Sequence, residues 1–200
     1  MGSPPPTDEV DDCRQSYLTM KQKGGKPVQK ITPMLWFDNQ AEQAANHYIS
    51  VFSKRPGSNR GISKVLDVTR YGEAGPGPAG TVMVVRFQLE GQEFTALNGG
   101  AQHFAFSEAI SFVVNCENQE EVDYFWSALS EGGEEGPCGW LKDRYGLSWQ
   151  VTPAGMEEML SHPDQAKAQR AMKAMLGMKK IDLAELERAF AGEPADAVRA

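Results

Sequence analysis

The sequence predicts an α+β fold in which two βαβββ units follow one another and are succeeded by a C-terminal helical tail. A strand-like run, an apolar helical stripe and three further strand-like runs occur in this order twice, over about 30–100 and 108–152. The segment 118–121 (NQEE) also repeats the segment 39–42 (NQAE) at a distance of 79 residues. A supersecondary unit that occurs twice in one chain indicates a duplicated fold.

The first unit begins with apolar residues at 30–37, which are bounded by turn residues and predict a strand. Pro33 makes this an edge strand or a bulged one. Asn39 is the expected N-cap of the following helix, with Glu42 three residues later, and apolar residues at helical spacing continue to Phe52. Three strands complete the unit, separated by a Gly/Pro loop and a short hairpin turn: 62–71, 81–90 and 93–98.

The second unit begins with a strand at 109–116, followed by a helix that Asn118 caps. Val122, Phe125 and Leu129 form the apolar stripe of this helix. Shorter strand-like runs follow at 132–136, 139–143 and 147–152.

Three short helices are expected in the tail, and Asp182 caps the third of them. The predicted organisation is a disordered leader over 1–28, the duplicated domain over 29–153 and C-terminal helices over 154–192.

Composition excludes several classes of protein. The chain has 20 basic and 27 acidic residues and a net charge of −7, which disfavours a nucleic-acid partner. No run approaches the ~18 apolar residues of a membrane span. Cys13, Cys116 and Cys138 form an odd set without CxxC spacing, and the N-terminus lacks the features of a secretory signal. We therefore expect a cytoplasmic protein without membrane contact.

Several segments resemble the PhnB-like family: 34–38 (MLWFD), 96–100 (ALNGG), 108–112 (EAISF), 138–151 (CGWLKDRYGLSWQV), 171–176 (AMKAML) and 178–182 (MKKID). This family is often labelled demethylubiquinone methyltransferase-like. It belongs to the vicinal oxygen chelate superfamily, with the glyoxalases and extradiol dioxygenases. The resemblance implies that the βαβββ units curl into a cup around a pocket, and that the protein is a homodimer. Open cups also expose strand edges, which proteins usually cover or pair.

Metal-dependent relatives hold their ion with His, Gln or Glu on the first and last strands of each unit. The resemblance places those positions at Thr32, Ala96, Ser111 and Gln150. Gln150 alone cannot hold a catalytic ion, because neutral hydroxyls and amides are weak donors. No metal and no other cofactor is therefore expected.

A methyltransferase is not predicted either. The glycines at Gly75, Gly77 and Gly80 lie in a Pro-broken loop between two strands. No Gly-rich loop joins a strand to a helix where adenosylmethionine would sit.

His103 and Cys138 are the candidate catalytic residues. His103 follows a strand near the expected mouth of the cup, and an imidazole titrates near pH ~6.5. Cys138 could be a nucleophile, since Lys142 and Arg144 are close in sequence. Each also has a structural interpretation, as a solvated histidine and as a small residue packed beside glycine.

Trp36, Asn98, Trp140 and Gln150 are the candidate substrate-binding residues. Aromatic rings with a few amides suit a flat or apolar small molecule, although the rings could equally be core. Trp149 and Gln150 are adjacent on one strand, so only one of them can face the cup. If Gln150 faces inward, Trp149 packs against a helix.

Three functions remain open at this point. The first is a metal-free protein that binds an unknown small molecule, with or without catalysis. The second is a metal-dependent lyase, isomerase or dioxygenase of the glyoxalase superfamily. The third is a structural or regulatory dimer without a ligand.

Overall fold

The computed structural model describes residues 29–57 and 62–194, so the predicted leader lies outside the described residues. The chain divides into two compact parts, Met1–Thr32 and Pro33–Ala200. Of the first part only residues 29–32 are described, and there the Gln29 amide donates to the carbonyl of Ile31 at 2.9 Å. All that follows concerns the second part.

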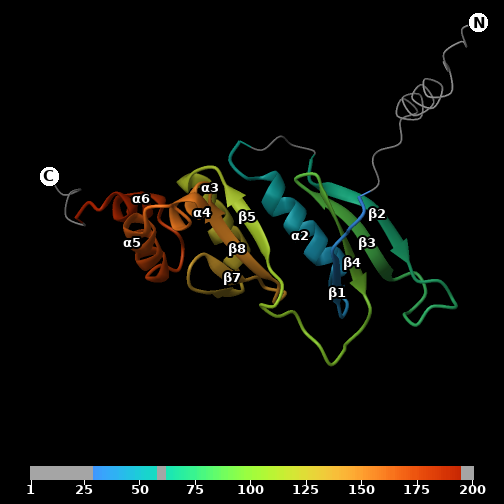
Figure 1. The fold of residues 1–200 in the computed structure, drawn as a ribbon. Helices are drawn as coiled ribbons and strands as arrows, with labels where there is room; N and C mark the ends of the chain where they lie inside the picture. Colours follow the sequence, from blue (N-terminus) through green and yellow to red (C-terminus); the bar gives the residue numbers. More distant parts are fainter. Residues whose placement is uncertain (1–28, 58–61, 195–200) are drawn as a thin grey trace, which may run out of the picture. The chain divides into compact units, whose positions relative to one another are not determined.

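The first βαβββ unit forms a four-stranded sheet in the order β1-β4-β3-β2, with β1 parallel to β4 and the other pairs antiparallel. Helix α2 packs against one face of this sheet (Figure 1). The elements are β1 (Met34–Phe37), α2 (Ala41–Ser53), β2 (Lys64–Arg70), β3 (Val82–Leu89) and β4 (Gln92–Asn98).

The second unit repeats this topology in the order β5-β8-β7-β6, with β5 parallel to β8. Helix α3 packs against one face of it. The elements are β5 (Phe112–Cys116), α3 (Gln119–Ser130), β6 (Glu134–Glu135), β7 (Trp140–Lys142) and β8 (Ser148–Pro153). The identical strand order in the two sheets confirms the predicted duplication.

The two units share one hydrophobic core. Tyr48 of α2 is fully buried, and its ring lies 5.4 Å from that of Trp149 of β8. The hydroxyl of Tyr124 in α3 donates to the carbonyl of Val51 in α2 at 2.7 Å. The helices of the two units therefore pack against each other and against both sheets.

The predicted cap of the first helix is wrong. Helix α2 begins at Ala41, Gln40 is its N-cap without a side-chain hydrogen bond, and the Ala41 N–H donates to the Asn98 side chain at 2.8 Å. The side-chain amide of Asn98, at the end of β4, thus caps the N-terminus of α2 in place of Asn39. In the second unit the prediction is confirmed, because Asn118 accepts from the N–H of Glu121 at 3.0 Å.

Two predicted strands are shorter than expected. The strand expected over 30–37 begins at Met34, and the strand expected over 109–116 begins at Phe112. Their C-terminal ends coincide with those of their parallel neighbours, because Phe37 pairs with Asn98 at the end of β4 and Cys116 pairs with Pro153 at the end of β8.

The tail consists of α4 (Met156–Leu160), α5 (Gln165–Leu176) and α6 (Leu183–Ala191). Asp182 caps α6 as predicted, accepting from the N–H of Glu185 at 2.9 Å. The tail has its own small cluster of buried residues, Ala171, Ile181 and Leu186. Among the described residues, no helix is long and apolar enough to cross a membrane.

The tail is attached to the second unit through the backbone before β7. The N–H groups of Cys138 and Gly139 donate to the carbonyls of Met178 and Lys179 at 2.8 and 2.7 Å. Gly139 has a φ of 83°, and a Cβ there would lie 2.7 Å from the carbonyl oxygen of Val151. Glycine is required at this contact for both reasons.

Candidate functional site

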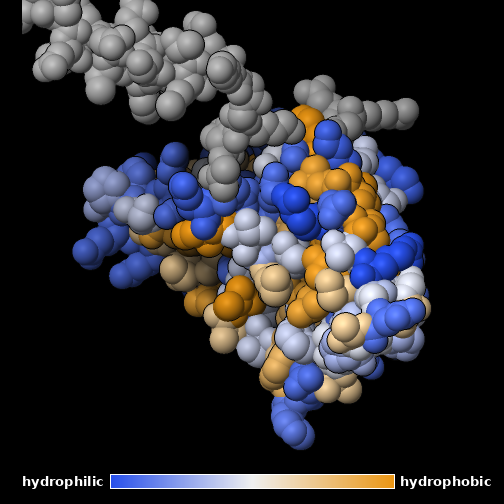
Figure 2. Space-filling model, turned by 90° about the vertical axis from the view of Figure 1, so that its right-hand side faces the viewer, coloured by the Kyte–Doolittle hydropathy of each residue, from blue (hydrophilic) through white to orange (hydrophobic). Residues whose placement is uncertain are grey.

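Each sheet has one face against a helix and one open face. In β1, Leu35 and Phe37 are buried, whereas Met34 is 62% and Trp36 36% exposed. In β5, Val113 is 50% exposed between the partly buried Phe112 and the buried Val114. Figure 2 shows hydrophobic residues that reach the surface in patches between hydrophilic ones, on the side of the molecule that it presents. Large apolar side chains exposed on a sheet indicate a surface that contacts another molecule.

Two predicted binding residues meet on the open face of the second sheet. Trp140 and Gln150 are direct cross-strand partners, so their side chains lie on the same side of the sheet. The Gln150 amide donates to the Ser111 hydroxyl at 2.8 Å. Trp149 is only 2% exposed and packs among aromatic rings near α2 and α3. Gln150 and Trp149 thus lie on opposite faces of the sheet, and Trp149 packs on the helix side, which is the arrangement expected if Gln150 faces the cup.

A pocket of about 370 Å³ lies on this open face, lined by Glu108, Glu134, Trp140, Lys142 and Ser148 among others. Lys142 and Glu108 form an ion pair at 2.5 Å, which raises the pKa of Lys142 and lowers that of Glu108. Ser148 is fully buried, and its hydroxyl has no hydrogen-bond partner within the described ranges. The pocket therefore combines an aromatic ring, charged groups and one unused polar atom.

Trp36 lies on the open side of the first sheet. Its indole N–H donates to the carbonyl of Gly100 at 2.9 Å, and its ring meets that of Phe104 edge-on at 5.6 Å. A Cβ at Gly99 would lie 2.1 Å from the indole, so only glycine fits beneath this ring. Trp36 and Phe104 also line a pocket of about 300 Å³ with Tyr145. The ring is held in place and remains accessible.

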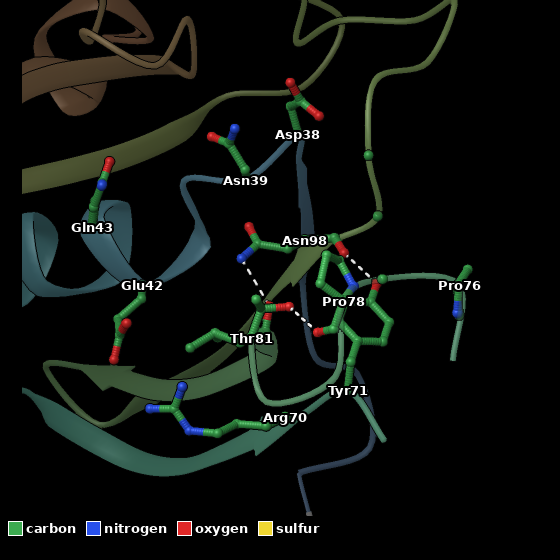
Figure 3. Close-up of a pocket in the computed structure, with 14 residues that line it drawn as sticks. Asp38, Asn39, Glu42, Gln43, Arg70, Tyr71, Pro76, Pro78, Thr81 and Asn98 are labelled. Atoms are coloured by element: carbon green, nitrogen blue, oxygen red, sulfur yellow. Dashed lines mark hydrogen bonds between the residues drawn. The ribbon is translucent and has the colours of Figure 1, made fainter. Parts of the chain in front are cut away.

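A further pocket of about 650 Å³ lies at the end of the first sheet, between the start of α2 and the β2–β3 loop (Figure 3). Asn98 forms part of its wall. The side-chain amide of Asn98 donates to the carbonyl of Val82 at 3.1 Å and accepts from the N–H of Ala41. The backbone carbonyl of Asn98 accepts from the Tyr71 hydroxyl at 2.5 Å. The nitrogen and the oxygen of this side-chain amide thus both form hydrogen bonds, which link β3 to α2.

The predicted catalytic pair is not brought into contact. His103 is exposed in the segment that joins the two units, and Cys138 lies between β6 and β7 with a φ of 57°. No hydrogen bond, ion pair or ring contact connects them in the part of the chain that the structure describes. Cys116 is a core residue, and burial raises the pKa of its thiol to about 12.

The residues at the expected metal positions do not fit a divalent ion. Ala96 is fully buried in the core. Its side chain is therefore not on the open face, where the family resemblance implies a metal ligand. Thr95 and Leu97 take the open side, because side chains alternate along a strand. Ser111 and Gln150 are bonded to each other. Thr32 belongs to the other compact part of the chain.

The remaining donors give no alternative metal centre. Among residues 29–57 and 62–194, no group of three or more His, Cys, Asp and Glu side chains could hold a metal ion.

Sequence reasoning missed the buried carboxylate of Asp143, which is 3% exposed between β7 and β8. Its oxygens accept from the Tyr48 hydroxyl and the Trp149 indole, each at 2.8 Å, and from the N–H groups of Tyr145 and Leu147. Burial, and then the charge of Asp143, raise the pKa of Tyr48 well above its usual value. The segment DRYG reads only as a turn, because the Tyr48 donor comes from the other unit.

Two βαβββ units, each with a sheet that is covered on one face and open on the other, define a protein of the vicinal oxygen chelate class. Residues 29–152 match the family model described as 3-demethylubiquinone-9 3-methyltransferase, and the chain belongs to this family, the PhnB-like proteins. The matched region ends before α4.

Solved structures agree with this assignment. The PhnB protein from Bacillus cereus is 39% identical, with a TM-score of 0.53, and the match covers 63% of this chain and 100% of that one. Protein PA1353 from Pseudomonas aeruginosa is 21% identical, with a TM-score of 0.50 and coverage of 63% and 98%. No curated protein matches the chain.

Proposed function

We propose that this PhnB-like protein binds a small molecule on the open face of its second sheet and does so without a metal ion. The observation that carries the proposal is the pocket beside Trp140, in which the Ser148 hydroxyl is buried and lacks a partner among the described residues. A buried hydroxyl without a hydrogen bond is costly, and a bound molecule would supply the missing bond. Gln150 and Val113 extend the same face.

The donor set argues against the metal-dependent alternative. The positions that hold an ion in metal-dependent relatives offer a buried methyl group at Ala96 and an amide bonded to a hydroxyl at Gln150 and Ser111. Neither arrangement provides the anionic or imidazole donors that hold transition metals firmly. We therefore derive no catalytic step through a metal.

Methyl transfer is not part of the proposal, although the family model carries that description. Gly75 and Gly77 lie against the ring of Tyr71 in the loop between β2 and β3, where a Cβ would come within 2.7 and 2.5 Å of it. They allow a loop to pack on an aromatic ring. They do not form the strand-to-helix turn that cradles a nucleotide-like cofactor.

We also propose that the protein is a cytoplasmic homodimer. Met34, Trp36 and Val113 are exposed on the open sheet faces, and Phe104 and Ile110 are 60% and 70% exposed in the segment that joins the units. A second copy of the chain would cover this apolar surface. The reduced thiols of Cys116 and Cys138 suit the cytoplasm. The binding roles of Trp36 and Asn98 and the catalytic roles of His103 and Cys138 remain predictions.

Native mass spectrometry tests the binding proposal on protein purified without a metal-affinity tag. We expect the native protein to carry or take up a small organic molecule, and Trp140→Leu to lose it. Trp36→Leu removes an exposed indole from the other sheet and tests the binding role predicted for Trp36. Retention of the molecule by this variant would confine the site to the second sheet, and its loss would assign Trp36 to the site as well. Equal retention by both variants would contradict the placement of the site.

Two measurements on the same sample test the other claims. Elemental analysis after dialysis should find no stoichiometric metal, whereas a retained metal together with loss of binding on chelation would favour the metal-dependent alternative. Light scattering should give the mass of two chains, and a single-chain mass at micromolar concentration would rule out the dimer.

A further inference from the structure

The pocket on the open face of the second sheet is dominated by carboxylates. Glu108, Glu134 and Glu135 line it, and Lys142 is its only basic lining residue among those described. Lys142 is already paired with Glu108 at 2.5 Å. The one positive charge of the lining is thus compensated from within the pocket.

The other two glutamates differ in their surroundings. Glu135 accepts from the Trp126 indole at 3.0 Å and lies 3.7 Å from the ammonium group of Lys179. Glu134 is exposed and has no ion pair in the described part of the chain. It stands opposite Lys142 in the β6–β7 register, which places its side chain on the same face of the sheet as the pocket. Glu134 also acts on the charge of Lys142, but that single ammonium group already forms an ion pair with Glu108. Two carboxylates and one lysine leave a net negative charge on this face of the sheet.

Ser148 provides the independent sign of a ligand. It is also opposite Lys142, in the β7–β8 register, and so faces the pocket, which it lines. Its side chain is fully buried and its hydroxyl oxygen has no partner within the described residues. A hydroxyl oxygen can accept a hydrogen bond from an N–H group. Trp140, two residues from Lys142 on the same face, adds the electron-rich surface of an indole.

We propose that this pocket selects an organic ammonium compound, an amine with N–H donors attached to a flat or apolar body. The inference rests on the proposed function and names the ligand class of the same site. The ammonium group would neutralise Glu134 and donate to Ser148, while the apolar body stacks on Trp140. An anion would meet the carboxylates of Glu108 and Glu134 and a lysine that is already paired, so the same charges exclude it.

Three probes of nearly equal shape test the charge preference by calorimetry on the full-length protein at neutral pH: 2-phenylethylammonium, 2-phenylethanol and 3-phenylpropanoate. We expect the cation to bind about 10-fold more tightly than the alcohol, and the carboxylate to bind most weakly. Glu134→Gln should reduce the preference for the cation about 5-fold, and Ser148→Ala should weaken cation binding by a similar factor. Glu187→Gln removes one exposed glutamate from α6 and should change nothing.

The outcomes separate this inference from the proposed function. Binding of all three probes with equal affinity, lost in Trp140→Leu, would overturn the ammonium preference and leave small-molecule binding in place. Tighter binding of the carboxylate, or no binding of the cation, would also overturn it. The proposed binding site itself fails if the native protein carries no small molecule, or if Trp140→Leu leaves the mass-spectrometric ligand load unchanged. Cation binding that depends on Glu134 and not on Glu187 would support both.

Discussion

The carboxylate of Asp143 connects the two βαβββ units, because it accepts a hydrogen bond from Tyr48 of the first unit. It accepts two side-chain and two backbone hydrogen bonds while almost fully buried. Replacing it with Ala leaves the Tyr48 hydroxyl and the Trp149 indole buried without a partner. We expect Asp143→Ala to lower the free energy of unfolding by about 3 kcal/mol or more, measured by urea denaturation.

Tyr48→Phe is the matched test of the same joint. It removes one donor and leaves the other three, so we expect a loss of only about 1 kcal/mol. An Asp143→Ala variant as stable as Tyr48→Phe would contradict the role assigned to the carboxylate.

His47 makes stability depend on pH. Burial, and then the nearby charge of Arg144, lower its pKa, and Asp143 and Glu131 oppose this only in part. The unfolded chain therefore binds a proton at about pH 6.5 that the folded chain takes up only at lower pH. This contribution to stability is complete above that pH and is lost as the pH falls through the folded pKa.

Urea denaturation between about pH 7.5 and pH 5 measures this effect. We expect His47→Gln to lose less stability than the native protein over this range. His103→Gln, which alters an exposed imidazole, should follow the native protein. Parallel curves for all three would show that His47 is not the group responsible.

At the scale of elements, the β3–β4 hairpin shows how turn chemistry sets a register. Leu89 pairs with Gln92, and the two residues between them, Glu90 and Gly91, have φ values of 45° and 89°. Two left-handed residues in succession give the tight turn whose twist matches that of the strands. Glycine at the second position avoids the steric cost of this conformation.

Gly91→Ala measures the steric cost of a side chain at positive φ alone, because no atom lies within 4 Å of the added Cβ. We expect a loss of about 1 kcal/mol in thermal or urea unfolding. Gly72→Ala is the control, since that position also has open space but no positive φ, and should be close to neutral. A neutral Gly91→Ala would mean that the turn relaxes.

Local patterns were enough to predict the order of the elements. The alternation of apolar residues, the hairpin signal at Gly91 and the caps at Asn118 and Asp182 depend on neighbours in sequence, and the structure confirms them. The cap at Asn39 was wrong because a residue distant in sequence, Asn98, took its place. The boundaries of β1 and β5 depend on pairing partners that the sequence does not reveal.

The site was less predictable for the same reason. Trp140 and Gln150 were predicted as binding residues, but their cross-strand pairing depends on a strand register that the order of elements does not give. The unpartnered hydroxyl of Ser148 and the buried carboxylate of Asp143 depend on which donors surround them in three dimensions. Serine and aspartate in a turn-rich segment carry no sign of burial, so no pattern could single them out.

At the scale of the whole molecule, one side chain fastens the tail to the second unit. Gln119 at the start of α3 donates to the carbonyl of Ile181 at 3.1 Å and accepts from the N–H of Leu183 at 2.8 Å. Ile181 is fully buried. The helices that follow the matched family region are thereby part of the packed structure.

We expect Gln119→Ala to loosen this attachment by about 1–2 kcal/mol, because two hydrogen bonds to the backbone are lost. Faster amide exchange over residues 178–183, without a change in the β3–β4 hairpin, is the expected result. Glu120→Ala, a change at the exposed neighbouring position, should leave exchange unaltered. Uniform acceleration throughout the chain would instead indicate global destabilisation.

The hydrogen bond between Tyr48 and Asp143 has an evolutionary consequence. After a duplication, each copy can in principle satisfy its own polar groups and drift independently. Here a hydroxyl from the first copy and a carboxylate from the second, 95 residues apart, satisfy each other in a common interior. Loss of the carboxylate would leave the Tyr48 hydroxyl buried without a partner, so the interior of the first copy depends on a residue that the second copy supplies.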